Sequence, residues 1–231
     1  METPFVGARA ALFDLDGTLI ETHIDFGQMK HEVLRLAEAH GVDRAPLEPL
    51  DILSAVEAGR EARKVAAGEW AARAFRMEAF ALLERIEAAQ CASPIPIAGA
   101  GELLHHLRLR GVAVGIVTRN CARVSRRLLE AGGLACDVLV TRDDVERPKP
   151  DPGHLRAALR AMGFGGEGDA RTASVMVGDH WMDVAAGRAA GLWTVGILRG
   201  REPAAFAPAA PDLLVPSMAA LAERVCGRAG A

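Results

Sequence analysis

Residues 8–18 read A-R-A-A-L-F-D-L-D-G-T, and this stretch decides the fold class of the chain. The apolar run at 8–13 predicts a short buried β-strand that leads directly into two aspartates, Asp14 and Asp16. Further apolar runs along the chain predict more strands: residues 112–117, 136–141, 173–177, 192–197 and 212–215. The runs are nearly continuous rather than alternating, which is typical of strands buried on both faces of a parallel sheet.

Helical patterns lie between these strands. Residues 121–131 carry an apolar stripe that ends at Gly132, a predicted stop signal. Asp151 followed by Pro152 is a typical helix start, with an N-cap and a proline at the first helical position. Strands that alternate with helices predict an α/β fold with right-handed crossovers and a Rossmann-like parallel sheet.

One block breaks this alternation. Residues 22–92 contain no convincing strand and carry several helical patterns. The longest of these places Trp70 and Met77 on one helix face. We therefore expect an all-helical cap at 22–92, inserted into a catalytic core made of residues 1–21 and 93–231.

Composition excludes several classes of protein. The 231 residues are 50% hydrophobic and 25% charged with a net charge of −3, so bulk charge favours neither nucleic acid nor an anionic membrane as partner. The N-terminus lacks the features of a signal peptide, and no apolar run approaches the ~20 residues of a membrane helix. The 4 cysteines show no C-x-x-C spacing and indicate reduced thiols. We expect a cytoplasmic monomer or homodimer.

Side chains that carry chemistry follow the predicted strands or precede a helix: Asp14, Asp16, Thr118, Lys149, Asp179 and Asp183. Ligands of open α/β sheets bind at the carboxyl edge of the strands, so these side chains should meet there. Crowded carboxylates repel one another, and a hard divalent cation such as Mg²⁺ resolves that repulsion. A hydroxyl and an ammonium group suit an anion instead, and the combination is typical of phosphoryl transfer.

Four motifs resemble the haloacid dehalogenase-like hydrolase superfamily. They are D-L-D-G-T from Asp14, V-T-R-N around Thr118, R-P-K-P around Lys149, and G-D-H-W-M-D around Asp179. The resemblance spans about residues 10–200 and covers the phosphatases that carry a helical cap after the first strand. Phosphoglycolate phosphatases are similar in the position and size of the cap and in the style of the motifs.

The resemblance implies the catalytic roles. Asp14 would be the nucleophile that forms an aspartyl-phosphate. Asp16 would donate a proton to the leaving oxygen and then accept one from the hydrolytic water. Thr118 and Lys149 would hold the phosphate oxygens. The substrate would be a small phosphomonoester, with phosphoglycolate as the named candidate.

The resemblance also implies the ligands of metal and substrate. Asp14, the backbone carbonyl of Asp16 and Asp179 would bind Mg²⁺, while Asp183 would support its water shell or orient Lys149. Further substrate contacts are expected from the D-G-T turn, the loop after Thr118 and the hinge into the cap: Gly17, Thr18, His23, Arg119 and Asn120.

Three alternatives stay open. A β-phosphoglucomutase-like phosphomutase would use the same aspartate pair and pass the phosphoryl group to a second hydroxyl. A non-catalytic phosphate-binding module would keep the site without turnover. The phosphonate-cleaving branch of the superfamily uses a cap lysine as a Schiff base, for which Lys30 and Lys64 are the only cap candidates. The presence of Asp16 favours phosphate esters over the dehalogenase reaction, which has no alcohol leaving group to protonate.

Overall fold

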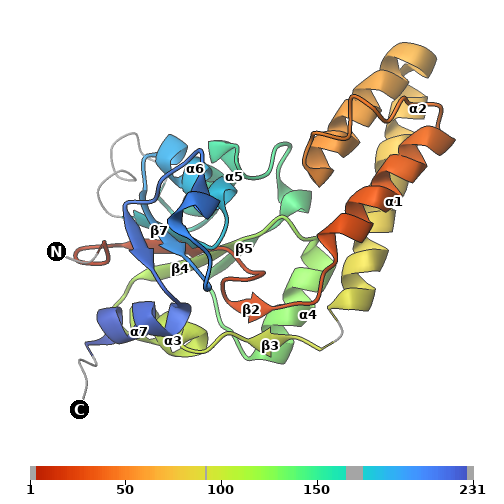
Figure 1. Cartoon of the computed structure of the whole chain (residues 1–231). Helices are drawn as coiled ribbons and strands as arrows, with labels where there is room; N and C mark the ends of the chain where they lie inside the picture. The colour runs from red at the N-terminus through yellow and green to blue at the C-terminus, as the bar shows by residue number, and fades with distance from the viewer. Residues whose placement is uncertain (1–3, 92, 165–173, 228–231) are drawn as a thin grey trace. The chain divides into compact units, whose positions relative to one another are not determined.

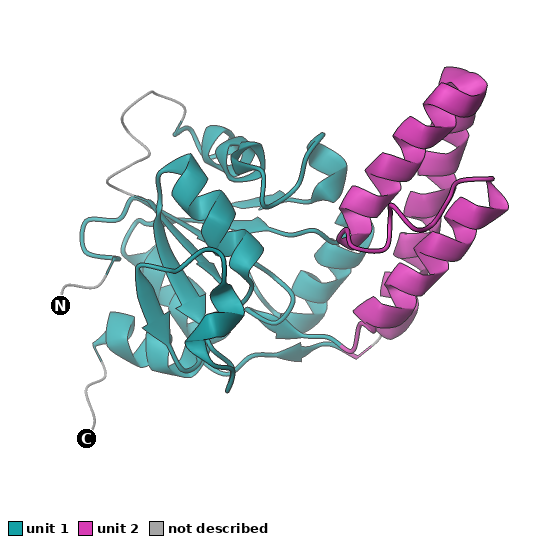
Figure 2. Cartoon of the chain, turned by 45° about the horizontal axis from the view of Figure 1, so that its top comes forward, with its two compact units in different colours: residues 1–22, 94–231 teal, residues 23–93 magenta. Residues whose placement is uncertain are grey.

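The computed structural model describes residues 4–91, 93–164 and 174–227. The chain divides into two compact units, residues 1–22 with 94–231 and residues 23–93 (Figure 2). The first unit contains the sheet and the second is helical. The division falls one residue after each boundary predicted from sequence.

The first unit is built on a six-stranded sheet with the order β5-β4-β1-β6-β7-β8. Every neighbouring pair is parallel. The strands are β1 (Ala10–Phe13), β4 (Ala113–Val117), β5 (Val138–Val140), β6 (Ser174–Gly178), β7 (Trp193–Ile197) and β8 (Leu213–Val215). Each lies within or next to an apolar run named above, so the predicted α/β class and parallel sheet are confirmed.

Helices cover both faces of this sheet (Figure 1). They are α3 (Ala100–Leu109), α4 (Ala122–Gly132), α5 (Pro152–Ala161), α6 (Trp181–Ala190) and α7 (Met218–Cys226), with short 3₁₀ turns at Arg142–Asp144 and Pro203–Phe206. Helices α5 and α6 pack together on one face, and α3 packs with α7 on the other. Leu12, Val117 and Met176 are buried with Leu155 and Leu159 of α5, which explains why the strand sequences are apolar throughout.

The structure tests two helix ends that were predicted from local sequence signals, the start of α5 and the end of α4. The Asp151 side chain accepts a hydrogen bond from the Gly153 N–H and caps α5. The stop signal of α4 differs by one residue: Gly132 is the last helical residue, and Gly133 adopts the left-handed conformation with φ of 61°. Glycine tolerates this conformation because it lacks a Cβ, so the second glycine of the pair ends the helix.

A two-stranded ribbon was missed by the sequence reading. Residues 93–99 are rich in proline and predict a linker, yet β3 (Ile95–Pro96) pairs antiparallel with β2 (Ile20–Glu21). Strands of two residues carry no readable periodicity, because a period-2 pattern needs at least four residues to show. The ribbon ties the segment after the D-G-T turn to the segment where the chain re-enters the sheet unit.

The helical unit consists of α1 (Phe26–Ala39) and α2 (Ile52–Gln90), the latter interrupted by non-helical backbone at Gly68 with φ of 82°. Its core packs Met29 and Val33 of α1 against Phe75 and Leu83 of α2. The sequence places Trp70 and Met77 on one face, and that face is open to solvent: the two residues are 83% and 73% exposed. Ala72, Phe75 and Ala79 form the buried stripe instead.

Among the helices in the described ranges, none is long and apolar enough to cross a lipid bilayer.

Candidate active site

The site lies where the order of the sheet reverses. From β1 the chain moves to β4 and β5 on one side, and then returns to β6, β7 and β8 on the other. Phe13 is level with Ile116 of β4 and with Val177 of β6, so the residues that follow these strands emerge at one edge. Ligands of open α/β sheets bind at such a switch point, outside the carboxyl ends of the strands.

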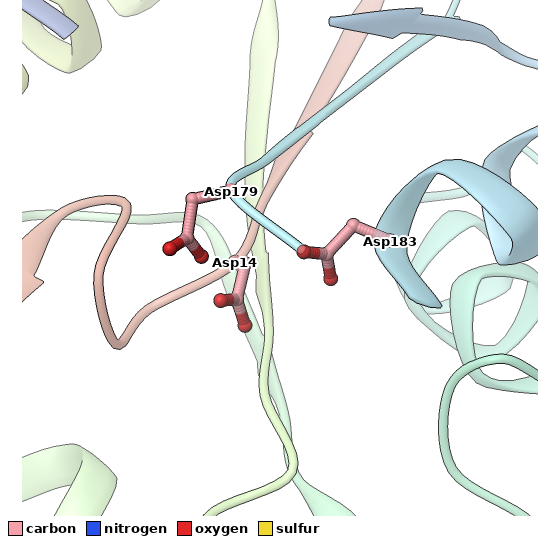
Figure 3. Close-up of side chains that lie close together, drawn as sticks. All are labelled: Asp14, Asp179 and Asp183. Carbon is pink, nitrogen blue, oxygen red and sulfur yellow. The ribbon is translucent and has the colours of Figure 1, made fainter. Parts of the chain in front are cut away.

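Three carboxylates meet at this edge. Asp14 follows β1, Asp179 follows β6, and Asp183 lies in the first turn of α6 (Figure 3). One oxygen from each lies within 4.8 Å of the others. Oxygens on opposite sides of a Mg²⁺ ion are about 4 Å apart, so a small closing movement suffices to bind one ion. The donor set is oxygen only, which suits a hard divalent cation.

A buried lysine joins two of these carboxylates. The Lys149 ammonium is 2.7 Å from Asp14 Oδ1 and 2.6 Å from Asp183 Oδ1, and it donates a third hydrogen bond to the Val117 carbonyl at 2.7 Å. Only 2% of the Lys149 side chain is exposed. Burial lowers the pKa of Lys149, and attraction to Asp14 and Asp183 outweighs it, so the pKa is raised and the ammonium stays charged. The Lys149 N–H donates to His154 Nδ1 at 3.1 Å, which fixes the base of this side chain.

Asp183 also caps the start of α6. Its Oδ2 accepts from the His180 N–H at 3.1 Å, while His180 Nδ1 accepts from the Met182 N–H. This reciprocal capping box occupies one Asp183 oxygen, and Lys149 occupies the other. Asp183 is therefore better placed to orient Lys149 than to bind a metal directly.

Burial raises the pKa of all three carboxyl groups of this cluster. The pKa of Asp14 rises to about 6 because of burial, with attraction to Lys149 opposing the shift and repulsion from Asp183 adding to it. The pKa values of Asp179 and Asp183 are raised as well, again first by burial. Crowded carboxyl groups with raised pKa values are typical of a site that a cation completes.

Asp16 is a near neighbour of this cluster and not a member of it. Its side chain accepts a hydrogen bond from the Thr22 hydroxyl, and its pKa is raised to about 6, chiefly by burial, while the Thr22 hydrogen bond opposes the shift. A carboxyl group that titrates near neutral pH can both donate and accept a proton, which suits a general acid and base. The Asp16 carboxylate is not one of the three that meet, so only its backbone carbonyl is left as the predicted metal ligand.

The loop after β4 contains residues that are predicted to bind the anion, Thr118 and Asn120. Thr118 is 1% exposed, and its Oγ1 accepts from the Asn120 N–H at 3.2 Å, which leaves the hydroxyl proton free to donate. Asn120 is 6% exposed, and its Nδ2 has no hydrogen-bond partner. A buried donor without a partner is costly, and an anion bound beside Thr118 would satisfy it. Arg142 steadies the loop by donating to the Arg119 carbonyl at 3.0 Å.

The other residues predicted to contact the substrate lie in both units: Gly17, Thr18 and Arg119 in the sheet unit and His23 in the helical unit. Gly17 is buried with φ of 79°, a conformation that favours glycine. Thr18 Oγ1 lies 3.5 Å from Asp179 Oδ1, a long contact that places this hydroxyl beside the metal candidates. The Arg119 guanidinium donates a hydrogen bond to the Met182 sulfur, so it contacts the first turn of α6. His23 is exposed and opens the helical unit, so its substrate contact stays a prediction.

Two arginines at this edge, Arg199 and Arg201, were not predicted from the sequence. Arg201 Nη2 lies 3.0 Å from Asp179 Oδ2, and Arg199 Nη1 lies 3.4 Å from the same oxygen. Arg199 also pairs with Glu21 of β2. The stretch L-R-G-R-E follows β7 directly, and that position was the available signal, because the carboxyl end of every strand of a parallel sheet lies at one edge.

The expected metal ligands lead to a first prediction. We expect Asp179→Ala to weaken Mg²⁺ binding about 10- to 100-fold, because it removes a carboxylate from the cluster. We expect Asp16→Ala to weaken it less than about fivefold, because this residue would bind through its backbone. Isothermal titration calorimetry of the metal-free variants with Mg²⁺ measures both dissociation constants. Equal losses would contradict this division of roles.

The fold and this edge together define a class: an α/β protein of Rossmann-like type whose site combines carboxylates for a cation with donors for an anion. The model of the haloacid dehalogenase-like hydrolases matches residues 8–191. The chain belongs to this family, as its four motifs predicted.

Relatives agree on the family and differ in substrate. Phosphoglycolate phosphatase of Rhodospirillum rubrum is 34% identical over 219 residues, which cover 85% of this chain and 83% of that protein. Phosphonoacetaldehyde hydrolase of Bordetella pertussis is 41% identical over 124 residues, but the match spans only 52% of this chain and 43% of that relative. A hydrolase from Pseudomonas syringae has a similar fold, with a TM-score of 0.62 and 22% identity over 96% of this chain and 100% of that one.

Proposed function

We propose that this protein is a Mg²⁺-dependent phosphatase that hydrolyses a small phosphomonoester through an aspartyl-phosphate. The observation that carries the proposal is the buried Lys149 ammonium between Asp14 and Asp183, beside an Asp14 carboxylate at the switch point of the sheet. This arrangement supports the proposal, because a nucleophilic Asp14 would then lie beside a cation that can offset negative charge on a transferring phosphoryl group.

In the first half-reaction, an Asp14 oxygen attacks phosphorus. The new Asp14–phosphorus bond forms as the bond from phosphorus to the ester oxygen breaks, and Asp16 donates its proton to the departing alkoxide. Lys149 and the Thr118 hydroxyl hold the phosphoryl oxygens. Bound at Asp14 and Asp179, Mg²⁺ would neutralise charge between the carboxylate and the approaching phosphate.

In the second half-reaction, Asp16 is ionised and accepts a proton from water. The water oxygen attacks phosphorus, the bond to Asp14 breaks, and inorganic phosphate leaves with the Asp14 carboxylate restored. The raised pKa of Asp16, about 6, supports this exchange of roles, because the energy of either protonation state is modest near neutral pH.

The helical unit would act as a cap on this chemistry. It is inserted between β2 and β3, so the antiparallel ribbon is where both of its ends join the core. Closure of a cap would exclude bulk water before attack, and reopening would release the products. His23, at the start of this unit, would then contact the leaving group.

For the substrate we propose phosphoglycolate. The support is the relative from Rhodospirillum rubrum, whose match covers most of both chains. Fold and motifs alone do not choose among phosphate esters.

A panel of about thirty phosphomonoesters tests the function, with phosphate release measured with and without Mg²⁺. Phosphoglycolate, hexose phosphates and nucleotides are included. We expect phosphoglycolate to exceed the others about tenfold or more in kcat/KM, equal to about 1.4 kcal/mol of transition-state preference. Phosphate release that does not depend on Mg²⁺, or no phosphate release from any ester, would contradict the proposal. Turnover that requires a sugar bisphosphate would identify a phosphomutase instead.

Phosphonate cleavage is a second candidate function, because phosphonoacetaldehyde hydrolase of Bordetella pertussis matches half of the chain. Two lysines of the helical unit are available for a Schiff base. Lys30 Nζ donates to the Leu47 carbonyl at 2.9 Å and also to the Leu50 carbonyl, and Lys64 is ion-paired with Glu69 at 3.2 Å. Burial lowers the pKa of Lys30, which favours a reactive amine, whereas its two carbonyl partners favour a structural role. Inactivation by borohydride in the presence of phosphonoacetaldehyde, lost in Lys30→Met, would support this candidate over the phosphatase.

A further inference from the structure

Two arginines converge on one carboxylate of the candidate metal site. Arg201 Nη2 lies 3.0 Å from Asp179 Oδ2 and also donates to the Asp179 backbone carbonyl. Arg199 Nη1 lies 3.4 Å from the same Oδ2, and its Nη2 pairs with Glu21. The Arg199 side chain is 32% exposed and the Arg201 side chain 39% exposed, so both are accessible to a ligand from solvent.

The Arg199 guanidinium lies against the D-G-T turn. A Cβ at Gly17 would sit 2.7 Å from Arg199 Nη1 and 2.7 Å from Asp179 Oδ2. Gly17 is adjacent to Asp16, the proposed proton donor to the leaving oxygen. The guanidinium is therefore packed against the turn that carries Asp16. If Asp16 protonates the leaving oxygen, the part of the substrate beyond that oxygen would lie near this turn.

The loop also holds Arg199 in an uncommon backbone conformation. Its φ is 52°, the single non-glycine residue with positive φ among the described residues. The left-handed region costs a residue with a Cβ about 1 kcal/mol or more. Leu198 and Arg199 donate backbone hydrogen bonds to Val215 and Pro216, at 2.9 and 3.0 Å, and hold the loop in place.

Metal binding changes what these arginines face. Asp179 is the partner that Arg199 and Arg201 share, and a divalent ion would take over much of its negative charge. Two guanidinium groups would then stand beside a cation with one carboxylate, Glu21, left in contact. Such an arrangement favours an additional anion, and guanidinium groups bind carboxylates and phosphates with paired hydrogen bonds.

We propose that Arg199 and Arg201 form a subsite for a second negatively charged group of the substrate, a carboxylate near the ester oxygen. The protein would thus prefer phosphate esters of hydroxy acids over esters of neutral alcohols. This inference rests on the proposed phosphatase function and adds the residues that choose the leaving group. It also implies that the arginines weaken Mg²⁺ binding, because they repel the ion and compete with it for Asp179.

Two pairs of substrates isolate the second charge. Phosphoglycolate differs from ethyl phosphate by a carboxylate in place of a methyl group, and 3-(phosphonooxy)propanoate differs from propyl phosphate in the same way, with the carboxylate one carbon further from the ester oxygen. We expect wild type to prefer the charged member of at least one pair. In Arg199→Met and Arg201→Met, the ratio of kcat/KM within that pair should fall about tenfold or more, the scale of one charge-assisted hydrogen bond.

Matched variants separate recognition from structure. Arg188→Met removes an exposed arginine of the same unit, paired with Asp212 at 3.5 Å, and should leave the ratio unchanged. Arg199→Lys and Arg201→Lys keep the charge and should restore part of the ratio. If all five variants shift the ratio equally, or none does, the subsite is refuted.

Mg²⁺ binding without substrate supplies a readout that does not require turnover. Isothermal titration should show tighter Mg²⁺ binding, about threefold or more, in Arg201→Met than in wild type, because a like charge has been removed. Weaker or unchanged binding would contradict the competition at Asp179. If wild type hydrolyses no ester, the phosphatase proposal fails. The subsite is then tested by binding alone, with the Asp14→Asn variant in the presence of Mg²⁺. This variant should bind phosphoglycolate more tightly than ethyl phosphate, and adding Arg199→Met should remove that preference.

Discussion

Asp14→Asn is expected to reduce kcat by about 10⁴-fold or more, because the amide cannot form the aspartyl-phosphate on which both half-reactions depend. The substitution preserves size and should preserve the fold. Lys149 keeps its bonds to Asp183 and to the Val117 carbonyl, and one negative charge leaves a crowded cluster. Phosphate release under saturating substrate, together with circular dichroism and the unfolding midpoint, measures both effects.

Asp43→Asn is the matched control for this change. Asp43 is an exposed residue of the helical unit that accepts one local hydrogen bond from the Ala45 N–H, at 3.0 Å. It should retain wild-type turnover. Mass spectrometry of acid-quenched wild type should find the phosphoryl group on Asp14. A folded Asp14→Asn protein with most of its rate, or a phosphoryl group on another residue, would show that Asp14 is not the nucleophile.

Lys149→Met is expected to lower the free energy of unfolding by about 3–5 kcal/mol when Mg²⁺ is absent, since it leaves buried carboxylates without their cation. Asp14 and Asp183 side chains are 13% and 3% exposed, so water replaces little of the lost interaction. Mg²⁺ should restore part of the loss by neutralising Asp14. Urea unfolding of the variant with and without Mg²⁺ measures the destabilisation and its recovery.

Lys64→Met serves as the comparison, because Lys64 is 48% exposed and paired with an equally exposed Glu69. Exposed ion pairs contribute about 0–1 kcal/mol, so this variant should stay close to wild type whether Mg²⁺ is present or not. A Lys149→Met protein as stable as Lys64→Met would show that Asp14 and Asp183 are protonated and neutral in the absence of metal. In that case Lys149 would contribute to catalysis without stabilising the fold.

Much of the candidate site could be predicted from sequence because parallel sheets obey a simple rule. Whatever follows the carboxyl end of a strand arrives at one edge, so Asp14, Thr118 and Asp179 were placed together from three apolar runs alone. Lys149 was found through its motif, and the structure shows that it pairs with Asp14 and Asp183. The loop after β7 obeys the same rule, and Arg199 and Arg201 were overlooked because no family motif marks them.

The sequence by itself determined the order of strands and helices, the parallel sheet and the residues at its edge, because apolar runs and the residues after them are local properties of the chain. Only the tertiary structure decided which charges meet: Arg201 reaches Asp179 from 22 residues away, and Arg199 reaches Glu21 across 178. It also decided that Trp70 and Met77 face solvent. Helical periodicity identifies a face, but only the neighbours packed against a helix determine whether that face is buried.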